Sequence, residues 1–181
     1  MAEEETGTPA PAPAPAAGAE ASDQMFKIQR IYLKDASFES PVTPKIFTEQ
    51  GQWQPQVALN LHTETTKLEN DLFEVVLTVT VTVKNGDETV YLTEVKQAGL
   101  FLAKGIPDER MGPLLGSFCP TQLFPFAREE ITSLVQKGGF PQLPLEPVNF
   151  DALYAQHLKA QREAAGGAAA GSEQSAEKTT H

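Results

Sequence analysis

The sequence predicts an α+β protein in which a four-stranded antiparallel sheet is followed by two helices. The clearest observation is the alternation of apolar and polar side chains over residues 73–83, which is the period of a strand. Asn85-Gly86 follows directly, and this dipeptide favours a tight hairpin. Apolar residues at helical spacing come later in the chain, so strands and helices are segregated.

The first two strands are predicted at residues 26–33 and 56–63. The first has aromatic and β-branched residues between charged ones. The second alternates cleanly, and we expect Val57, Leu59 and Leu61 to share one of its faces.

The third and fourth strands form the hairpin around Asn85-Gly86. On residues 73–83 the apolar face carries six residues: Phe73, Val75, Leu77, Val79, Val81 and Val83. On the returning strand, residues 89–97, one face is predicted to be half-buried: Tyr91, Thr93, Val95 and Gln97. Leu92 and Glu94 fall on the other, half-exposed face. They are either a contact site or ordinary surface residues.

The helices are predicted from spacing and caps. Asp108 could cap a short turn, which Gly112-Pro113 is expected to end. An amphipathic helix ending at Gly138-Gly139 is predicted from one apolar stripe: Phe126, Ala127, Ile131, Leu134 and Val135. Asn149 is a good N-cap for a last helix.

Composition divides the chain into one domain and two tails. Residues 1–23 are rich in Ala, Pro and Glu, and residues 159–181 in Ala and Gly. Neither tail has enough large apolar groups to offset the entropy of ordering, so both are predicted to be disordered. Residues 24–158 are then a single domain.

Charge and cysteine content limit the partners and the compartment. The formal net charge of −10 disfavours nucleic acid and anionic membranes, because both repel a negative surface. A basic protein partner is a better match. One cysteine, no secretory signal and no apolar run near 20 residues predict a cytoplasmic protein without membrane insertion.

The sequence contains no pattern that predicts catalysis, a cofactor or a metal site. A glycine-rich phosphate loop, a His-Glu helix pair and a Gly-x-Ser-x-Gly elbow are all missing. Cys119 has no neighbouring base in sequence and is predicted to be a buried, inert thiol. We therefore expect a binding protein rather than an enzyme.

Residues 139–148 are predicted to be extended, because three prolines restrict the backbone. The apolar side chains between them must lie along an apolar surface. This segment could form the wall of a groove that holds another chain, or it could be an ordinary buried crossover.

Several stretches resemble the SecB family of bacterial preprotein-export chaperones over about residues 25–158. The long matches occur in the family's order, as Ile28-Gln29-Arg30-Ile31-Tyr32, Trp53-Gln54-Pro55, Tyr91-Leu92-Thr93-Glu94-Val95, Leu123-Phe124-Pro125-Phe126-Ala127-Arg128-Glu129, Gly139-Phe140-Pro141-Gln142-Leu143 and Pro147-Val148-Asn149-Phe150-Asp151-Ala152-Leu153. The tails do not take part in the resemblance.

The resemblance implies an ATP-independent holdase that keeps unfolded preproteins competent for export and delivers them to the motor SecA. It also implies a homotetramer, a dimer of dimers with eight-stranded sheets outside and helices between them. A SecB-like chaperone dedicated to a toxin–antitoxin pair is the alternative within the same fold.

The resemblance also implies roles for individual residues. The patch for the zinc-bearing basic tail of SecA would be Asp35, Glu39, Leu92 and Glu94. The client groove would draw on Trp53, Val57, Leu59, Leu61, Tyr91, Phe118, Phe124, Phe126, Phe140, Leu143 and Leu145. The helix layer and oligomer contact would include Thr93, Val95, Gln97, Ile131 and Leu134.

Overall fold

The computed structural model describes residues 24–48 and 54–173, with side chains described through residue 164. One antiparallel sheet has the strand order β1-β4-β3-β2. Its strands are β1 (Met25–Glu39), β2 (Pro55–Lys67), β3 (Leu72–Asn85) and β4 (Glu88–Lys104). The helical elements are α1 (Lys45–Thr48), α2 (Asp108–Pro113), a π-helical turn (Leu114–Phe118), α3 (Cys119–Lys137) and α4 (Phe150–Glu173). The predicted α+β fold is confirmed.

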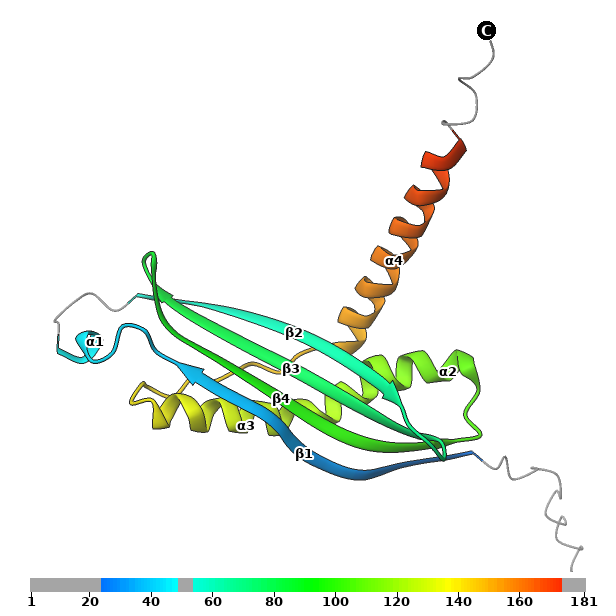
Figure 1. Cartoon of the computed structure of the whole chain (residues 1–181), viewed down its shortest axis with the longest axis horizontal. Helices are drawn as coiled ribbons and strands as arrows, with labels where there is room; N and C mark the ends of the chain where they lie inside the picture. Colours follow the sequence, from blue (N-terminus) through cyan, green and yellow to red (C-terminus); the bar gives the residue numbers. More distant parts are fainter. Residues whose placement is uncertain (1–23, 49–53, 174–181) are drawn as a thin grey trace, which may run out of the picture.

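The sheet and α3 form two layers (Figure 1). α3 lies along one face of the sheet, which we call the inner face. It packs on β4, β3 and β1. The opposite, outer face of the sheet has no described helix over it, and α4 projects away from both layers (Figure 1). The molecule therefore offers one buried and one open sheet face.

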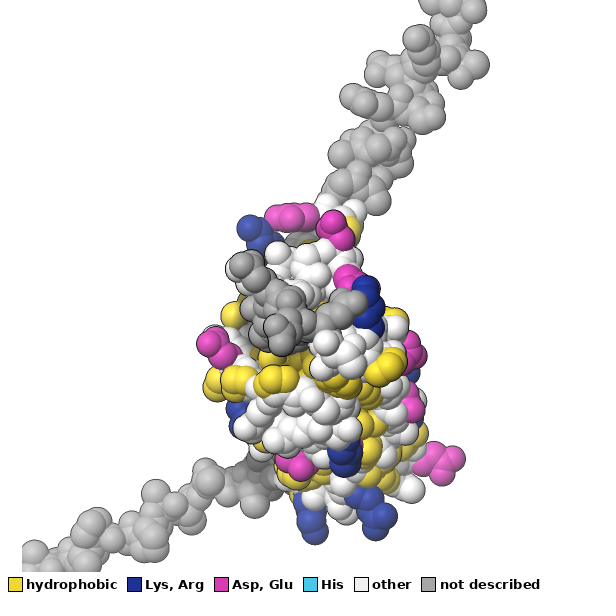
Figure 2. All heavy atoms as spheres, turned by 90° about the vertical axis from the view of Figure 1, so that its left-hand side faces the viewer, with side chains coloured by type: hydrophobic (Ala, Val, Ile, Leu, Met, Phe, Trp, Pro, Cys, Tyr) yellow, Lys and Arg dark blue, Asp and Glu magenta, His cyan; other side chains and the backbone are white. Residues whose placement is uncertain are grey.

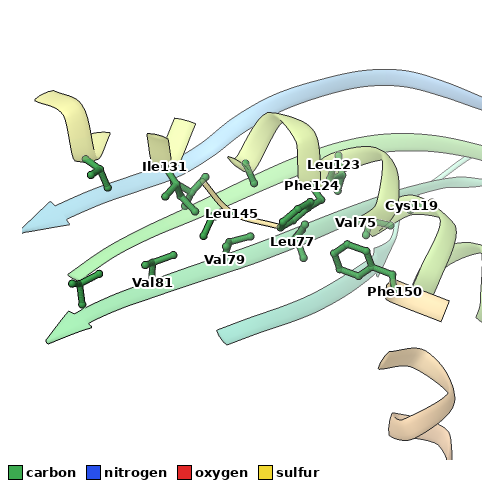
Figure 3. Packing of buried hydrophobic residues seen from close by; sticks show 14 of the residues in the cluster. Val75, Leu77, Val79, Val81, Cys119, Leu123, Phe124, Ile131, Leu145 and Phe150 are labelled. Carbon is green, nitrogen blue, oxygen red and sulfur yellow. The ribbon is translucent and has the colours of Figure 1, made fainter. Parts of the chain in front are cut away.

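The core lies between the inner face and α3, where every second residue of β3 is buried. Val75, Leu77, Val79 and Val81 are all 0% exposed, as the alternation predicts. From the other side α3 contributes a stripe of fully buried residues at helical spacing, namely Leu123, Ala127, Ile131 and Val135. Figure 3 shows Leu123 and Ile131 beside the strand residues. Each Val, Leu or Ile side chain among them gains about 1.5–3 kcal/mol from leaving water.

The helical region differs from the prediction because its prolines do not interrupt it. Pro113 was expected to end a short turn, yet α2, the π-helical turn and α3 follow one another directly. Pro120 stands in the first turn of α3 and Pro125 inside the helix, and neither ends it. The π-helical turn after Pro113 widens the local hydrogen-bond pattern, which accommodates the break. α3 therefore begins at Cys119, ahead of the predicted stripe.

The ends of α3 and α4 follow the expected capping chemistry. Gly139 after α3 has a φ of +83°, which glycine adopts without strain. The Asn149 side-chain oxygen accepts a hydrogen bond of 3.0 Å from the backbone N–H of Ala152, so the predicted N-cap of α4 is confirmed. The expected domain boundary at residue 158 falls inside α4, which continues to Glu173 because its Ala, Gln, Lys and Arg residues favour helix.

The strands are longer than predicted, most of all β1 and β4. β4 continues through Ala98 and Gly99, two residues that seldom favour strands, because both neighbours pair with it there. Residues 1–23 and 174–181 lie outside the described residues, so the expected disordered tails stay predictions there. Within the described ranges, none of the helices combines the length and the apolar character that a membrane span requires.

Gly99 leaves no room for a side chain at its position on the inner face of β4. A Cβ at this position would lie 2.6 Å from Cε2 of Phe101 and 3.0 Å from Cδ2 of Leu123, and both side chains are fully buried. We therefore expect Gly99→Ala to lower the free energy of unfolding by about 1–3 kcal/mol, as overpacking does. Urea denaturation measures it. Phe101→Leu, which removes the ring edge, should cost less in the Gly99→Ala background than in the wild type. Additive losses would contradict the steric explanation.

Candidate functional site

Four aromatic side chains gather at the end of the molecule where α1 lies. We call this cluster the aromatic end: Phe38 from β1, Phe47 from α1, Tyr91 from β4 and Phe140 from the segment after α3. The ring centroids of Tyr91 and Phe140 are 4.9 Å apart, and those of Phe47 and Phe140 are 5.1 Å apart. Exposure rises from 3% at Tyr91 to 53% at Phe47, so the cluster runs from the core to the surface.

The two glycines after α3 make this cluster possible. A Cβ at Gly138 would lie 2.4 Å from Cζ of Phe38. A Cβ at Gly139 would lie 3.3 Å from Cζ of Phe47, and its positive φ disfavours any other residue. The Gly138-Gly139 pair therefore stops α3 and also lets two aromatic rings approach the backbone.

An apolar strip connects the aromatic end with the edge strand β2. Val57 pairs with Val83, and Val83 pairs with Tyr91, so the three side chains share one row of the inner face. Val57 is 47% exposed and Leu59 38%, because α3 does not extend over β2. We call Val57, Leu59 and Leu61 the apolar ledge. Figure 2 views this end, where hydrophobic side chains reach the surface among charged ones.

The predicted groove residues that the structure describes separate into two environments. Four are buried inside the core: Tyr91, Phe124, Phe140 and Leu145. The apolar ledge is open or half-open, as are Phe118 and Phe126 on the helices and Leu143 on residues 139–148, which we call the proline segment. Trp53 lies outside the described residues.

Two grooves border the helices. One of about 510 Å³ lies between α3 and the proline segment and is lined by Pro125, Arg128, Gln136, Gln142 and Leu145, among others. A second, of about 440 Å³, is lined by Leu114, Phe118 and Asp151, among others. The proline segment is thus both a buried crossover, at Phe140 and Leu145, and one wall of a groove.

Sequence reasoning missed Phe38 and Phe47 as members of the aromatic end. Phe38 lies beyond the predicted end of the first strand, and Phe47 stands in a four-residue helix between Pro44 and the segment 49–53. Neither residue belongs to a periodic pattern of apolar residues in the sequence. Their places in the cluster follow only from the three-dimensional structure, which brings β1, α1 and the segment after α3 together.

The outer face brings the four predicted patch residues together. Glu39 pairs with Leu92 and Ser37 with Glu94, so Asp35, Glu39, Leu92 and Glu94 lie on neighbouring rows of β1 and β4. Leu92 and Glu94 are half-exposed, as expected from the alternation of β4. We call this set the acidic face. Thr80 of β3 donates a hydrogen bond of 2.9 Å to Glu94 Oε2, and Lys96 Nζ lies 3.6 Å from Glu94 Oε1.

A second polar cluster adjoins the acidic face. Lys34 Nζ lies 2.9 and 2.8 Å from the two carboxylate oxygens of Glu74, and the Tyr32 hydroxyl donates to the same group. The hydrogen bonds from Lys34 and Tyr32 lower the pKa of Glu74. Burial, together with the neighbouring carboxylate, raises the pKa of Tyr32 to about 12. This cluster links β1 to β3 across β4.

The residues predicted for the helix layer lie in the layer between the sheet and α3, three on β4 and two on α3 itself. Thr93, Val95 and Ile131 are 0% exposed, and Thr93 donates a hydrogen bond to the Ser37 carbonyl. Gln97 is 5% exposed and Leu134 is half-buried. Their part in an oligomer contact stays a prediction.

The groups that could carry chemistry are dispersed. Cys119 is fully buried, and burial raises the pKa of its thiol to about 12, which keeps it protonated. Among residues 24–48 and 54–173, no three His, Cys, Asp or Glu side chains are placed to hold a metal ion. The described residues therefore offer no cluster of groups placed for chemistry, and the candidate site is a binding surface.

Comparisons with known proteins agree on one family. The family model described as "Preprotein translocase subunit SecB" matches residues 19–161. The chain is 58% identical over 134 residues to the protein-export protein SecB of Thioalkalivibrio sulfidiphilus, covering 74% of this chain and 79% of that protein. It is 53% identical over 151 residues to the protein-export protein SecB of Ectopseudomonas mendocina, covering 83% and 92%.

A solved structure has a similar fold. It is the SecB-like chaperone Rv1957 of Mycobacterium tuberculosis in complex with a ChAD peptide from the antitoxin HigA1. The TM-score is 0.57 at 19% identity, with 68% of this chain and 90% of that chain covered. At this identity the likeness supports the fold alone.

The Glu74 cluster makes stability depend on pH. Because the pKa of Glu74 is lowered in the folded state, its stabilising effect is present above the ordinary glutamate value of 4.5 and is lost as pH falls through the folded pKa. Glu74→Gln should lower the free energy of unfolding by about 1 kcal/mol at pH 7. The difference in the free energy of unfolding between this variant and the wild type should disappear as pH falls below 4.5. Urea denaturation at a series of pH values measures it. Glu64→Gln, at a carboxyl whose side chain is 68% exposed, is the matched control and should change little. A constant gap at every pH would contradict this role for the Glu74 charge.

Proposed function

The chain belongs to the SecB family of preprotein-export chaperones, and from this premise we propose which of its surfaces binds clients and which binds the partner. The aromatic end and the apolar ledge hold unfolded preproteins without ATP. The acidic face docks the basic, zinc-bearing tail of SecA, to which the client is delivered. The observation that carries the proposal is the placement of these surfaces on opposite faces of one sheet, so both partners can bind at once.

The apolar surface suits an unfolded chain because it can bind apolar client segments of many different sequences. Phe47, Val57 and Leu59 are between 38% and 53% exposed and project from two different elements. Aromatic and β-branched side chains gain from any apolar client segment, since burial is non-directional. Such a surface fits a chaperone with many clients.

The acidic face suits a basic partner. Glu39 pairs with Leu92, Glu94 lies in the next row of the same face, and Asp35 lies one row further, so three carboxylates follow one another beside an apolar side chain. Opposite charges steer association and fix register, while an apolar side chain adds area. A basic tail with an apolar side chain is therefore the fitting partner.

We propose that the protein assembles as a dimer of dimers through the edge of β1. Met25, Ile28 and Leu33 on this strand are 49%, 37% and 46% exposed, which a bare edge strand rarely tolerates. Antiparallel pairing with a second copy would build an eight-stranded sheet. It would leave the β2 edge, which carries the apolar ledge, for clients. The helices would then lie between two such sheets, in the cytoplasm.

The toxin–antitoxin alternative is not favoured. The SecB-like chaperone Rv1957, whose structure contains an antitoxin peptide, is 19% identical to this chain, whereas relatives named as protein-export proteins are 53% to 58% identical.

The client surface is tested by delayed refolding of an unfolded export precursor. The wild type should slow refolding at stoichiometric amounts. Phe47→Ser should weaken client binding about two- to tenfold with little change in stability, because this ring is half-exposed. Leu68→Ser is the matched control, since Leu68 is 41% exposed in the turn between β2 and β3. A wild type that leaves refolding unchanged would refute the holdase function, and equal effects of both variants would refute the placement.

The partner surface is tested by charge reversal. Glu94→Lys should weaken binding of a zinc-loaded SecA tail peptide roughly tenfold, because it replaces an attraction by a repulsion. Client binding should stay at the wild-type level, since Glu94 lies on the opposite face of the sheet. Glu64→Lys, on the outer face of β2, is the control and should have a smaller effect. Isothermal titration calorimetry measures both affinities, and an unchanged peptide affinity would exclude the acidic face.

A further inference from the structure

Two lysines stand beside the acidic face, and the structure places them differently. Lys34 immediately precedes Asp35 at a register shift of β1, yet its ammonium group lies on Glu74. Lys96 is in β4, two residues after Glu94, and its ammonium group lies toward Glu94. One basic group is therefore directed away from the acidic face and the other into it.

Lys96 lies beside two of the three carboxylates of the acidic face. It pairs with Asp35 of β1 in the end row of that face, and its ammonium group lies 3.6 Å from Glu94 Oε1. The other oxygen of Glu94 accepts the Thr80 hydroxyl. The Lys96 side chain is 41% exposed, which leaves its ammonium group able to swing into solvent. A basic group of a partner that binds Glu94 must therefore compete with the Lys96 ammonium group.

Lys34 is restrained by two contacts of Glu74. Both carboxylate oxygens of Glu74 lie within 2.9 Å of Lys34 Nζ, and the Tyr32 hydroxyl donates to one of them. Tyr32 and Lys34 reach Glu74 from β1 across β4, away from Asp35. Without Glu74 the nearest carboxylate along the strand for Lys34 is Asp35.

We propose that the lysines of this chain set the affinity of the acidic face for its basic partner. Lys96 is an internal counter-ion that the partner displaces, and Glu74 with Tyr32 keeps Lys34 from becoming a second one. The inference rests on the proposed function, because it assigns a tuning role within the surface proposed to dock the SecA tail. Thr80 holds Glu94 in place while the cations exchange.

The first test replaces Lys96. The probe is the zinc-loaded SecA tail peptide, titrated by calorimetry at low and at high ionic strength. Lys96→Gln should tighten binding about two- to fivefold at low ionic strength, which is the range of an exposed ion pair, and less at high ionic strength. Equal or weaker binding would overturn the proposal, because Lys96 would then be neutral or would position Glu94.

The matched control is Lys159→Gln on α4. Lys159 Nζ lies 3.9 Å from Glu163, so this change also removes one positive charge and releases one glutamate, but on another element. It should leave the peptide affinity unchanged. A gain equal to that of Lys96→Gln would show that net charge alone matters and would also overturn the proposal.

The second test releases Lys34. Glu74→Gln should weaken peptide binding about twofold, although Glu74 is not in the acidic face. Lys34→Gln combined with Glu74→Gln should restore the wild-type affinity, because the competing cation is gone. If the double variant binds as weakly as Glu74→Gln alone, Lys34 does not compete for the acidic face, and the part of the proposal that concerns Lys34 fails. Thermal unfolding of each variant establishes that it is folded at the titration temperature.

Glu94→Gln separates the inference from the function on which it rests. If the wild type does not bind the peptide, or Glu94→Gln binds it as well as the wild type does, the acidic face is not the docking surface and both proposals fail. If Glu94→Gln weakens binding while Lys96→Gln changes nothing, the docking surface stands and only the tuning role is lost.

Discussion

The structure depends on the burial of one sheet face beneath α3. The alternating valines of β3 and the buried stripe of α3 exclude water from the same layer, and each member is almost completely buried. Since the side-chain period of a strand is two, burying one set of residues fixes the other set on the outside. Both candidate surfaces follow from this constraint.

β4 illustrates how one strand serves two functions. Its inward residues Thr93 and Val95 are fully buried, whereas Glu94 between them lies on the acidic face. A slip of one residue in register would exchange the two sets and destroy both the core and the acidic face at once. The register shift of β1 between Leu33 and Asp35 matters for the same reason, because it returns Asp35 to the outer face beside Lys96.

The sequence predicts what depends on periodicity and capping, and fails where contacts between distant segments decide. The buried face of β3, the half-exposed Glu94 and the Asn149 cap were all readable from local pattern. The continuous helical region was not, because tertiary packing on the sheet stabilises a helix through Pro120 and Pro125. The sequence alone does not show which of the apolar residues outside the strands are exposed and which are buried. Phe140 and Phe126 read alike, yet one is 6% exposed and the other 50%.

The same constraint links the proposed assembly to the proposed client binding. The exposed apolar side chains of one protomer are few, and each gains only about 1.5–3 kcal/mol on burial. Ordering a client residue costs roughly 1–2 kcal/mol of backbone entropy, so a short contact yields little net affinity. Tight holding of an unfolded chain then requires several such surfaces within reach of one client. Pairing through β1 would supply them, because it covers the exposed apolar side chains of that edge and leaves each apolar ledge at the outer rim of a wider sheet.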